Sequence, residues 1–110
     1  MEIGSTTPDN LIAGDFPRVT GWLDIPAGEL KRGTVMTSDG EAMETGGDPY
    51  AVLAEDISAA DGPVPGPVYL TGEFAKRFMI LDGGAELADA DVAKLRALSI
   101  FAKTSVPAIE

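Results

Sequence analysis

The hydrophobic and polar positions of this chain alternate in short runs that glycine and proline residues separate. The run at residues 19–25 has a period of two, the spacing expected of a β-strand with one buried face. Its buried face would consist of Val19, Gly21, Leu23 and Ile25. Similar short runs predict further strands at residues 33–37, 50–57, 68–74, 78–81 and 100–101.

Two stretches predict long connections between these strands. Residues 38–49 contain four acidic side chains and two glycine turn signals, which is typical of a solvated loop. Residues 61–67 contain three prolines, and a proline donates no backbone hydrogen bond. We therefore expect residues 61–67 to form a stiff exposed loop and not a helix or a central strand.

One helix is expected near the C-terminal end of the chain. The apolar positions at helical spacing are Val92, Leu95 and Leu98. Asp89 is a favourable N-cap residue, and Asp91 suits the positive end of the helix dipole. Lys94 and Arg96 suit the opposite end for the same reason. Short strands with one C-terminal helix predict a small, β-rich α+β domain.

Length and composition are those of one globular domain of 110 residues, of which 45% are hydrophobic. The longest apolar runs, at 51–54 and 78–81, are about four residues long, whereas a membrane-spanning helix needs about twenty. The first ten residues contain neither the basic start nor the apolar stretch of a secretory signal. We therefore expect a soluble chain that is not exported by that route.

The inventory of reactive side chains excludes several functions. The chain contains no cysteine and no histidine, which removes thiol nucleophiles, thiolate metal sites and the commonest general base. Its formal net charge is −10, from 18 acidic and 8 basic residues. Such a surface repels phosphate backbones and anionic lipids, so nucleic acid and membranes are not expected as partners.

Carboxylates are the abundant reactive groups that remain, and no pair of them is spaced for catalysis. Glu55 and Asp56 are neighbours on a predicted strand, so their side chains point to opposite faces. Helix capping and the dipole account for Asp89 and Asp91. The acids of residues 38–49 lack the spacing of a calcium-binding loop. We predict no catalytic residue, metal site or cofactor, and a protein that is not an enzyme.

Five segments, in order and spacing, resemble the lambda-type bacteriophage head decoration proteins. They are residues 11–17 (LIAGDFP), 27–35 (AGELKRGTV), 51–56 (AVLAED), 67–74 (PVYLTGEF) and 98–102 (LSIFA). The likeness covers residues 10–106, although no single segment is chemically diagnostic. Members of this family are small, β-rich proteins that assemble as trimers on the outside of the expanded phage capsid. There they clamp neighbouring major capsid proteins, at three-fold and quasi-three-fold positions, against internal DNA pressure.

The resemblance implies a homotrimer with the major capsid protein as its partner. The protein would be made in the host cytoplasm and located on the outer surface of the virion. Trp22 and the aromatic residues of 69–78 could then belong either to the core or to the trimer seam.

The resemblance also implies an N-terminal capsid-binding arm at residues 1–14 and a decoration domain at residues 15–110. Residues 1–10 are polar and contain one large aliphatic side chain, so they bury too little surface to offset their ordering entropy. In the family such an arm orders on the capsid by pairing with capsid strands. The arm residues implied as contacts are Ile3, Thr6, Thr7, Pro8, Leu11 and Ile12.

A different class of function remains open beside this one. Residues 25–36 are similar to the strand–turn–strand step of lipoyl-like domains, which are barrel-sandwich carriers with a modified lysine at a hairpin tip. Lys31 would be that lysine, although it lacks the Asp-Lys or Met-Lys context of those domains. The alternative is therefore a carrier or small-molecule-binding module.

Overall fold

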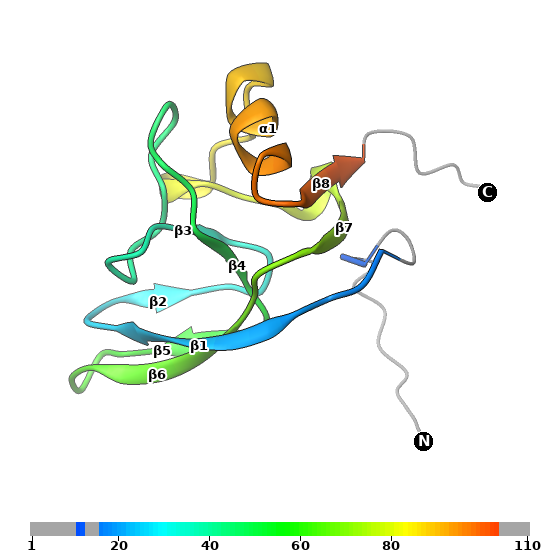
Figure 1. The fold of residues 1–110 in the computed structure, drawn as a ribbon. Helices are drawn as coiled ribbons and strands as arrows, with labels where there is room; N and C mark the ends of the chain where they lie inside the picture. The colour runs from blue at the N-terminus through cyan, green and yellow to red at the C-terminus, as the bar shows by residue number, and fades with distance from the viewer. Residues whose placement is uncertain (1–10, 13–15, 104–110) are drawn as a thin grey trace.

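Strands dominate the part of the chain that the computed structural model describes, residues 11–12 and 16–103 (Figure 1). In chain order the strands are β1 (Thr20–Ile25), β2 (Glu29–Leu30), β3 (Val35–Met36), β4 (Ala51–Leu53), β5 (Ile57–Ser58), β6 (Val64–Tyr69), β7 (Gly72–Ala75) and β8 (Ile100–Lys103). The helices are α1 (Asp89–Arg96) and two short 3-10 helices, Lys76–Phe78 and Asp82–Gly84. This is the β-rich α+β class expected from the sequence.

The described strands form three sheets. The largest has the strand order β1-β6-β4-β3, and all its neighbours are antiparallel. β2 and β5 form an antiparallel pair, and β7 and β8 form a parallel pair. In Figure 1, β7 and β8 lie at one end of the molecule, and the loops β1–β2, β3–β4 and β5–β6 lie at the opposite end.

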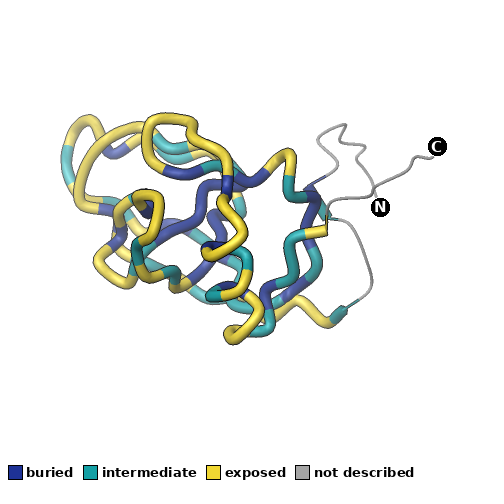
Figure 2. The backbone as a smooth tube through the Cα atoms, turned by 90° about the horizontal axis from the view of Figure 1, so that it is seen from above, coloured by how far each residue is buried: buried dark blue, intermediate teal, exposed yellow. Residues whose placement is uncertain are grey.

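The large sheet separates two hydrophobic clusters, because neighbouring residues on a strand point to opposite faces. One face contributes Ile25, Met36, Ala51, Leu53 and Val68 to the first cluster. The other contributes Val35 and Val52 to a second cluster, with Tyr69 packed against it. The remaining members of this second cluster are Leu11, Met43, Phe74, Met79, Leu81, Leu87, Leu95 and Ile100. Figure 2 shows buried backbone through the middle of the molecule and exposed loops around it.

The expectation of a loop at residues 61–67 is wrong, because β6 begins at Val64 and is an inner strand of the large sheet. Leu70 N donates to Val19 O at 2.6 Å, and the alternation of antiparallel pairs then places Pro65 and Pro67 at positions that need no hydrogen bond to β1. Pro67 O points away from β1 and accepts from Ala54 N at 2.9 Å. The two prolines therefore leave the β1–β6 ladder intact.

The strand predicted at residues 50–57 is divided between β4 and β5, which belong to different sheets. Arg32 forms hydrogen bonds with the residues between them. Its guanidinium donates to Ala54 O at 2.8 Å, and its backbone N–H donates to Asp56 Oδ1 at 2.8 Å. Ala54 keeps one hydrogen bond to β6, through its N–H, and the contacts of Arg32 take the place of strand pairing from Ala54 O to Asp56.

The strand predicted at residues 68–74 is also interrupted, between β6 and β7. At the break, Thr71 Oγ1 donates to Pro17 O at 2.7 Å and accepts from Val19 N at 3.0 Å. Gly72 then takes a positive φ of 147° as β7 begins. The chain changes sheet at this point, because the Thr71 hydroxyl bonds to the segment that precedes β1 and the chain then pairs with β8.

Residues 78–81 do not form the predicted strand. The 3-10 helix Lys76–Phe78 closes with Met79 N donating to Lys76 O at 3.0 Å. Ile80 forms only a single bridge, to Thr34. Met79 and Leu81 are nevertheless buried, so the alternating pattern reported core positions and not a strand.

Other predicted boundaries differ by a few residues. β3 covers two of residues 33–37, and β8 continues two residues past 101 to Lys103. In β1 the inner face is Gly21, Leu23 and Ile25 as predicted, whereas Val19 precedes the strand and is 52% exposed.

α1 confirms the predicted helix, with corrected ends. The N-cap is Ala88 and not Asp89, which is the first helical residue. Leu95 is buried and Val92 packs against the core, but Leu98 lies beyond the last helical residue and is exposed.

Two parts of the acidic loop at residues 38–49 pack against the large sheet. Met43 is fully buried, and its backbone N–H donates to Val35 O at 2.8 Å. Gly40, at a φ of 82°, packs so closely against β1 that a Cβ there would overlap Asp24 O. A loop that composition alone assigns to solvent therefore packs against the sheet.

This close approach predicts an unequal response to two alanine substitutions. Gly40→Ala adds a clash with rigid backbone to the strain of a positive φ, so it should destabilise the fold by more than about 2 kcal/mol. Gly46 has a similar φ of 84°, but no atom lies within 4 Å of its added Cβ. Gly46→Ala should therefore cost only the conformational strain, about 1 kcal/mol. Urea unfolding followed by circular dichroism measures both, and equal losses would contradict the packing described.

Candidate functional site

The residues implied as an N-terminal contact arm fall into two groups. Ile3, Thr6, Thr7 and Pro8 lie outside the described residues. Leu11 and Ile12 are described, and both belong to the body of the domain.

Leu11 and Ile12 form the outer partner of β7. Ala75 N donates to Leu11 O at 2.7 Å, and Ile12 forms an antiparallel bridge with Phe74. The Leu11 side chain is 1% exposed and belongs to the second hydrophobic cluster. β7 is consequently paired on both sides, by β8 and by this N-terminal segment.

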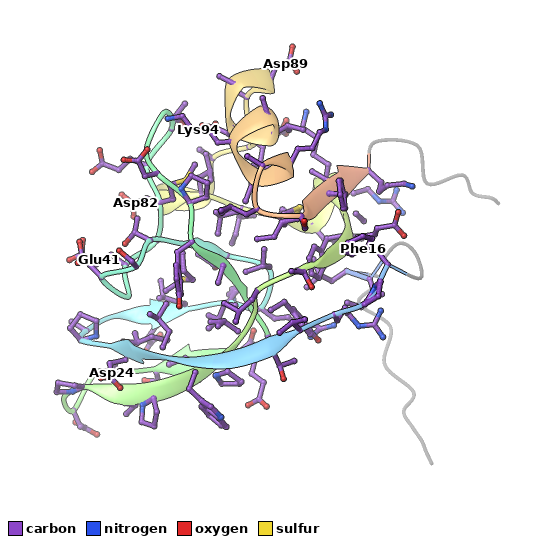
Figure 3. All side chains as sticks on the ribbon, viewed as in Figure 1. Phe16, Asp24, Glu41, Asp82, Asp89 and Lys94 are labelled. Atoms are coloured by element: carbon purple, nitrogen blue, oxygen red, sulfur yellow. The ribbon has the colours of Figure 1, made fainter. Side chains whose placement is uncertain are left out.

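An aromatic and charged surface covers the outer face of the β7–β8 pair. Phe16 N donates to Glu73 Oε1 at 3.1 Å, and the Phe16 ring meets Phe101 edge-on with centroids 5.0 Å apart. Lys103 Nζ lies 3.3 Å from Glu73 Oε2. The sequence pattern did not single out Phe16, because its partners Glu73 and Phe101 are far from it along the chain. This surface lies beside Leu11 and Ile12, at the end where Figure 3 labels Phe16.

The structure shows, for several aromatic residues, whether they belong to the core or to the surface. Phe74 is fully buried, and its ring lies 5.3 Å from that of Tyr69. Trp22, in contrast, is 72% exposed on β1, opposite Pro67. Phe78 is 37% exposed at the end of its 3-10 helix. Trp22 and Phe78 are therefore surface residues.

Asp91, which the sequence suggested only for the helix dipole, holds two backbone segments together. Its carboxylate is fully buried. Oδ1 accepts from Gly46 N at 2.9 Å, and Oδ2 accepts from Ala88 N at 3.0 Å. Lys94, one turn later, donates to Gly46 O and Gly47 O, both at 2.8 Å. This cluster joins the acidic loop to α1 and has a structural role.

Of the other carboxylates considered for chemistry, Asp56 accepts from Arg32 N, as described above. Within residues 11–12 and 16–103, no group of three or more acidic residues is placed to hold a metal ion.

Open hollows in the described part of the surface surround β2. One of about 360 Å³ includes Lys31 in its lining, with Glu29 and Asp56 beside it. β2 pairs with β5 whereas β3 pairs with β4, so the turn at Lys31 does not join two paired strands. The hairpin tip that a lipoyl-like carrier requires is therefore not formed here.

Comparison with known proteins adds no relative: no family model and no curated protein matches this chain. Across the described residues, no helix has the length and apolar character needed to cross a membrane.

The Asp91 cluster predicts a large effect for one acid of α1 and a small one for its neighbour. Asp91→Ala leaves two backbone N–H groups without their buried acceptor, so the free energy of unfolding should fall by about 2 to 4 kcal/mol. Asp89→Ala removes an exposed charge from the same turn and should cost no more than about 1 kcal/mol. Urea unfolding compares the two, and similar losses would contradict a linking role for Asp91.

Proposed function

We propose that this protein decorates a phage capsid: it binds as trimers to the outside of the expanded head, at three-fold and quasi-three-fold positions, and stabilises the head against internal DNA pressure. The observation that carries the proposal is the pairing of Leu11 and Ile12 with β7, which anchors the N-terminal segment to the edge of a stable β-rich body. The resemblance in residues 10–106 supplies the class of partner.

The physical basis of the proposed attachment is strand addition. An extended segment that adds to the edge of a partner's sheet gains main-chain hydrogen bonds without needing a particular sequence. Ordering the segment costs conformational entropy, so one arm alone binds weakly. Three arms on one trimer raise the effective concentration of each other and make the whole attachment tight.

The packing of Leu11 shortens the arm that this mechanism can use. Leu11 and Ile12 contribute to the fold of the described chain, so residues 1–10 are the segment proposed to meet the capsid. Leu11 and Ile12 then anchor that segment at β7, in place of the capsid contact implied for them by the resemblance. The proposed role requires no catalytic residue, metal or cofactor.

Decoration predicts a direct effect on head stability. A protein that binds only the intact head stabilises it by about 2.7 kcal/mol per site at a hundredfold excess over Kd. DNA-filled heads of the parent phage, stripped of this protein, should therefore release DNA at a lower temperature than heads to which it has been restored. A DNA-binding dye measures the release during heating, and identical release curves would overturn the proposed function.

The arm mechanism predicts that binding and folding can be separated by two variants. Deletion of residues 1–10 should weaken binding to expanded heads at least tenfold, because three arms are lost per trimer, and should leave urea unfolding nearly unchanged. Leu11→Ala should lower the free energy of unfolding by about 3 kcal/mol through a core cavity. Sedimentation with heads measures binding. Full-strength binding by the truncated protein would refute the arm mechanism and leave the decoration role standing.

A further inference from the structure

Positive charge gathers at the end of the molecule that β7 and β8 form. Arg18 lies against the first residue of β7, since its Cγ is 3.0 Å from the position that a Cβ on Gly72 would take. Lys76 and Arg77 follow directly after β7, and Lys103 pairs in register with its last residue. These four cations, half of the chain's 8 basic residues, are called the basic end below.

The charge of the basic end is largely uncompensated within the described chain. Glu73 is the acidic residue of β7, and it is engaged by Lys103 and by Phe16 N. Arg18 and Arg77 are exposed, and neither forms an ion pair with another described residue. The described residues of this end therefore present more positive than negative charge, on a protein whose net charge is −10.

Acidic side chains lie on the opposite side of the molecule. Figure 3 places Asp24 of β1, Glu41 of the acidic loop and Asp82 of the 3-10 helix Asp82–Gly84 across the fold from Phe16. Electrostatic interactions in physiological salt fall off over about 8 Å, so charges on opposite sides of the fold are largely screened from one another.

Besides its two lysines, the basic end has the arginine and aromatic residues that are typical of a protein interface. The Arg77 guanidinium stacks over the partly exposed Phe78 ring at 4.9 Å from its centroid. Phe16 and Phe101 form an edge-on pair on the neighbouring face of the β7–β8 sheet. Arginine and aromatic residues are enriched at protein–protein interfaces, where lysine and acidic residues are depleted.

The course of the chain points to the same end. Leu11 and Lys103 both lie beside Ala75, the last residue of β7. Residues 1–10 therefore continue from the basic end, and so does the chain beyond Lys103. An arm that engages a partner brings this end of the domain toward that partner.

We propose that the basic end is a docking surface for an acidic protein surface, one rich in aspartate and glutamate. The inference rests on the proposed function, in which that surface is the outside of the capsid. Attraction at the basic end orients the approaching protein, and the acidic loops then face solvent. Duplex nucleic acid is not favoured as the occupant, because four cations on a protein of net charge −10 offer little counterion release.

Two single charge reversals test the docking surface against a matched control. Arg18→Glu and Arg77→Glu each change the net charge by two units within the basic end. Lys31→Glu makes the same change at an exposed position between β2 and β3. At 50 mM salt the first two should each weaken binding to undecorated expanded heads by about tenfold, and Lys31→Glu by less than twofold. The differences should shrink at 500 mM salt, because screening is then stronger.

The outcomes separate the inference from the proposed function. Wild-type binding with equal effects of all three reversals would overturn the docking surface and leave capsid decoration in place. No binding by the wild type would overturn the decoration role itself. Circular dichroism of each variant establishes that loss of binding is not loss of fold.

A second probe distinguishes the class of partner. The wild type and the Arg18→Glu variant are each titrated into a labelled 30-base-pair DNA duplex at 50 mM salt, and fluorescence anisotropy measures binding. We expect no binding by either protein, which supports a protein partner. Binding by the wild type that Arg18→Glu abolishes would overturn the assignment in favour of nucleic acid.

Discussion

The fold depends on β6, an inner strand that contains two prolines. β6 pairs with β1 over six residues and with β4 at Val68 and Tyr69, so it connects the first and second halves of the chain. Proline can occupy such a strand only where the missing N–H is not needed by a neighbour. Pro65 and Pro67 occupy non-hydrogen-bonded positions opposite β1, and Ala54 O, which faces Pro67 on the other side, accepts from the Arg32 guanidinium instead. Both hydrophobic clusters include residues of the sheet that this strand holds together.

Local patterns predicted those elements whose interactions are themselves local. The class of fold, the β1 alternation and α1 follow from periodicity and composition, and the structure agrees with them. The breaks after Leu53 and Tyr69 depend on Arg32 and on the Pro17–Thr71 contact, which join segments distant in sequence. No window of the sequence contains both partners of such a contact. The prediction of a loop at residues 61–67 was wrong for a related reason. The sequence shows a proline, but not whether a neighbouring strand needs a backbone N–H at that position.

The candidate site shows the same division. The sequence indicated the N-terminal segment and the absence of His and Cys chemistry, yet it could not show that Leu11 is part of the core. The basic end was likewise invisible, because Arg18, Arg77 and Lys103 are separated along the chain and meet only around β7. The net charge of −10 is a total for the whole chain and does not say where the charged side chains lie in the fold.

The contacts of Asp91 and Lys94 with the turn at Gly46 and Gly47 have a consequence for local opening. An isolated helix of eight residues is unstable in water, so α1 depends on its partners for stability. The same hydrogen bonds hold this turn, whereas Met43 and Gly40 hold the earlier part of the loop. The helix and the turn should thus unfold together as one cooperative unit. Their slowly exchanging amides would share a single opening free energy, although the two segments are far apart in the chain.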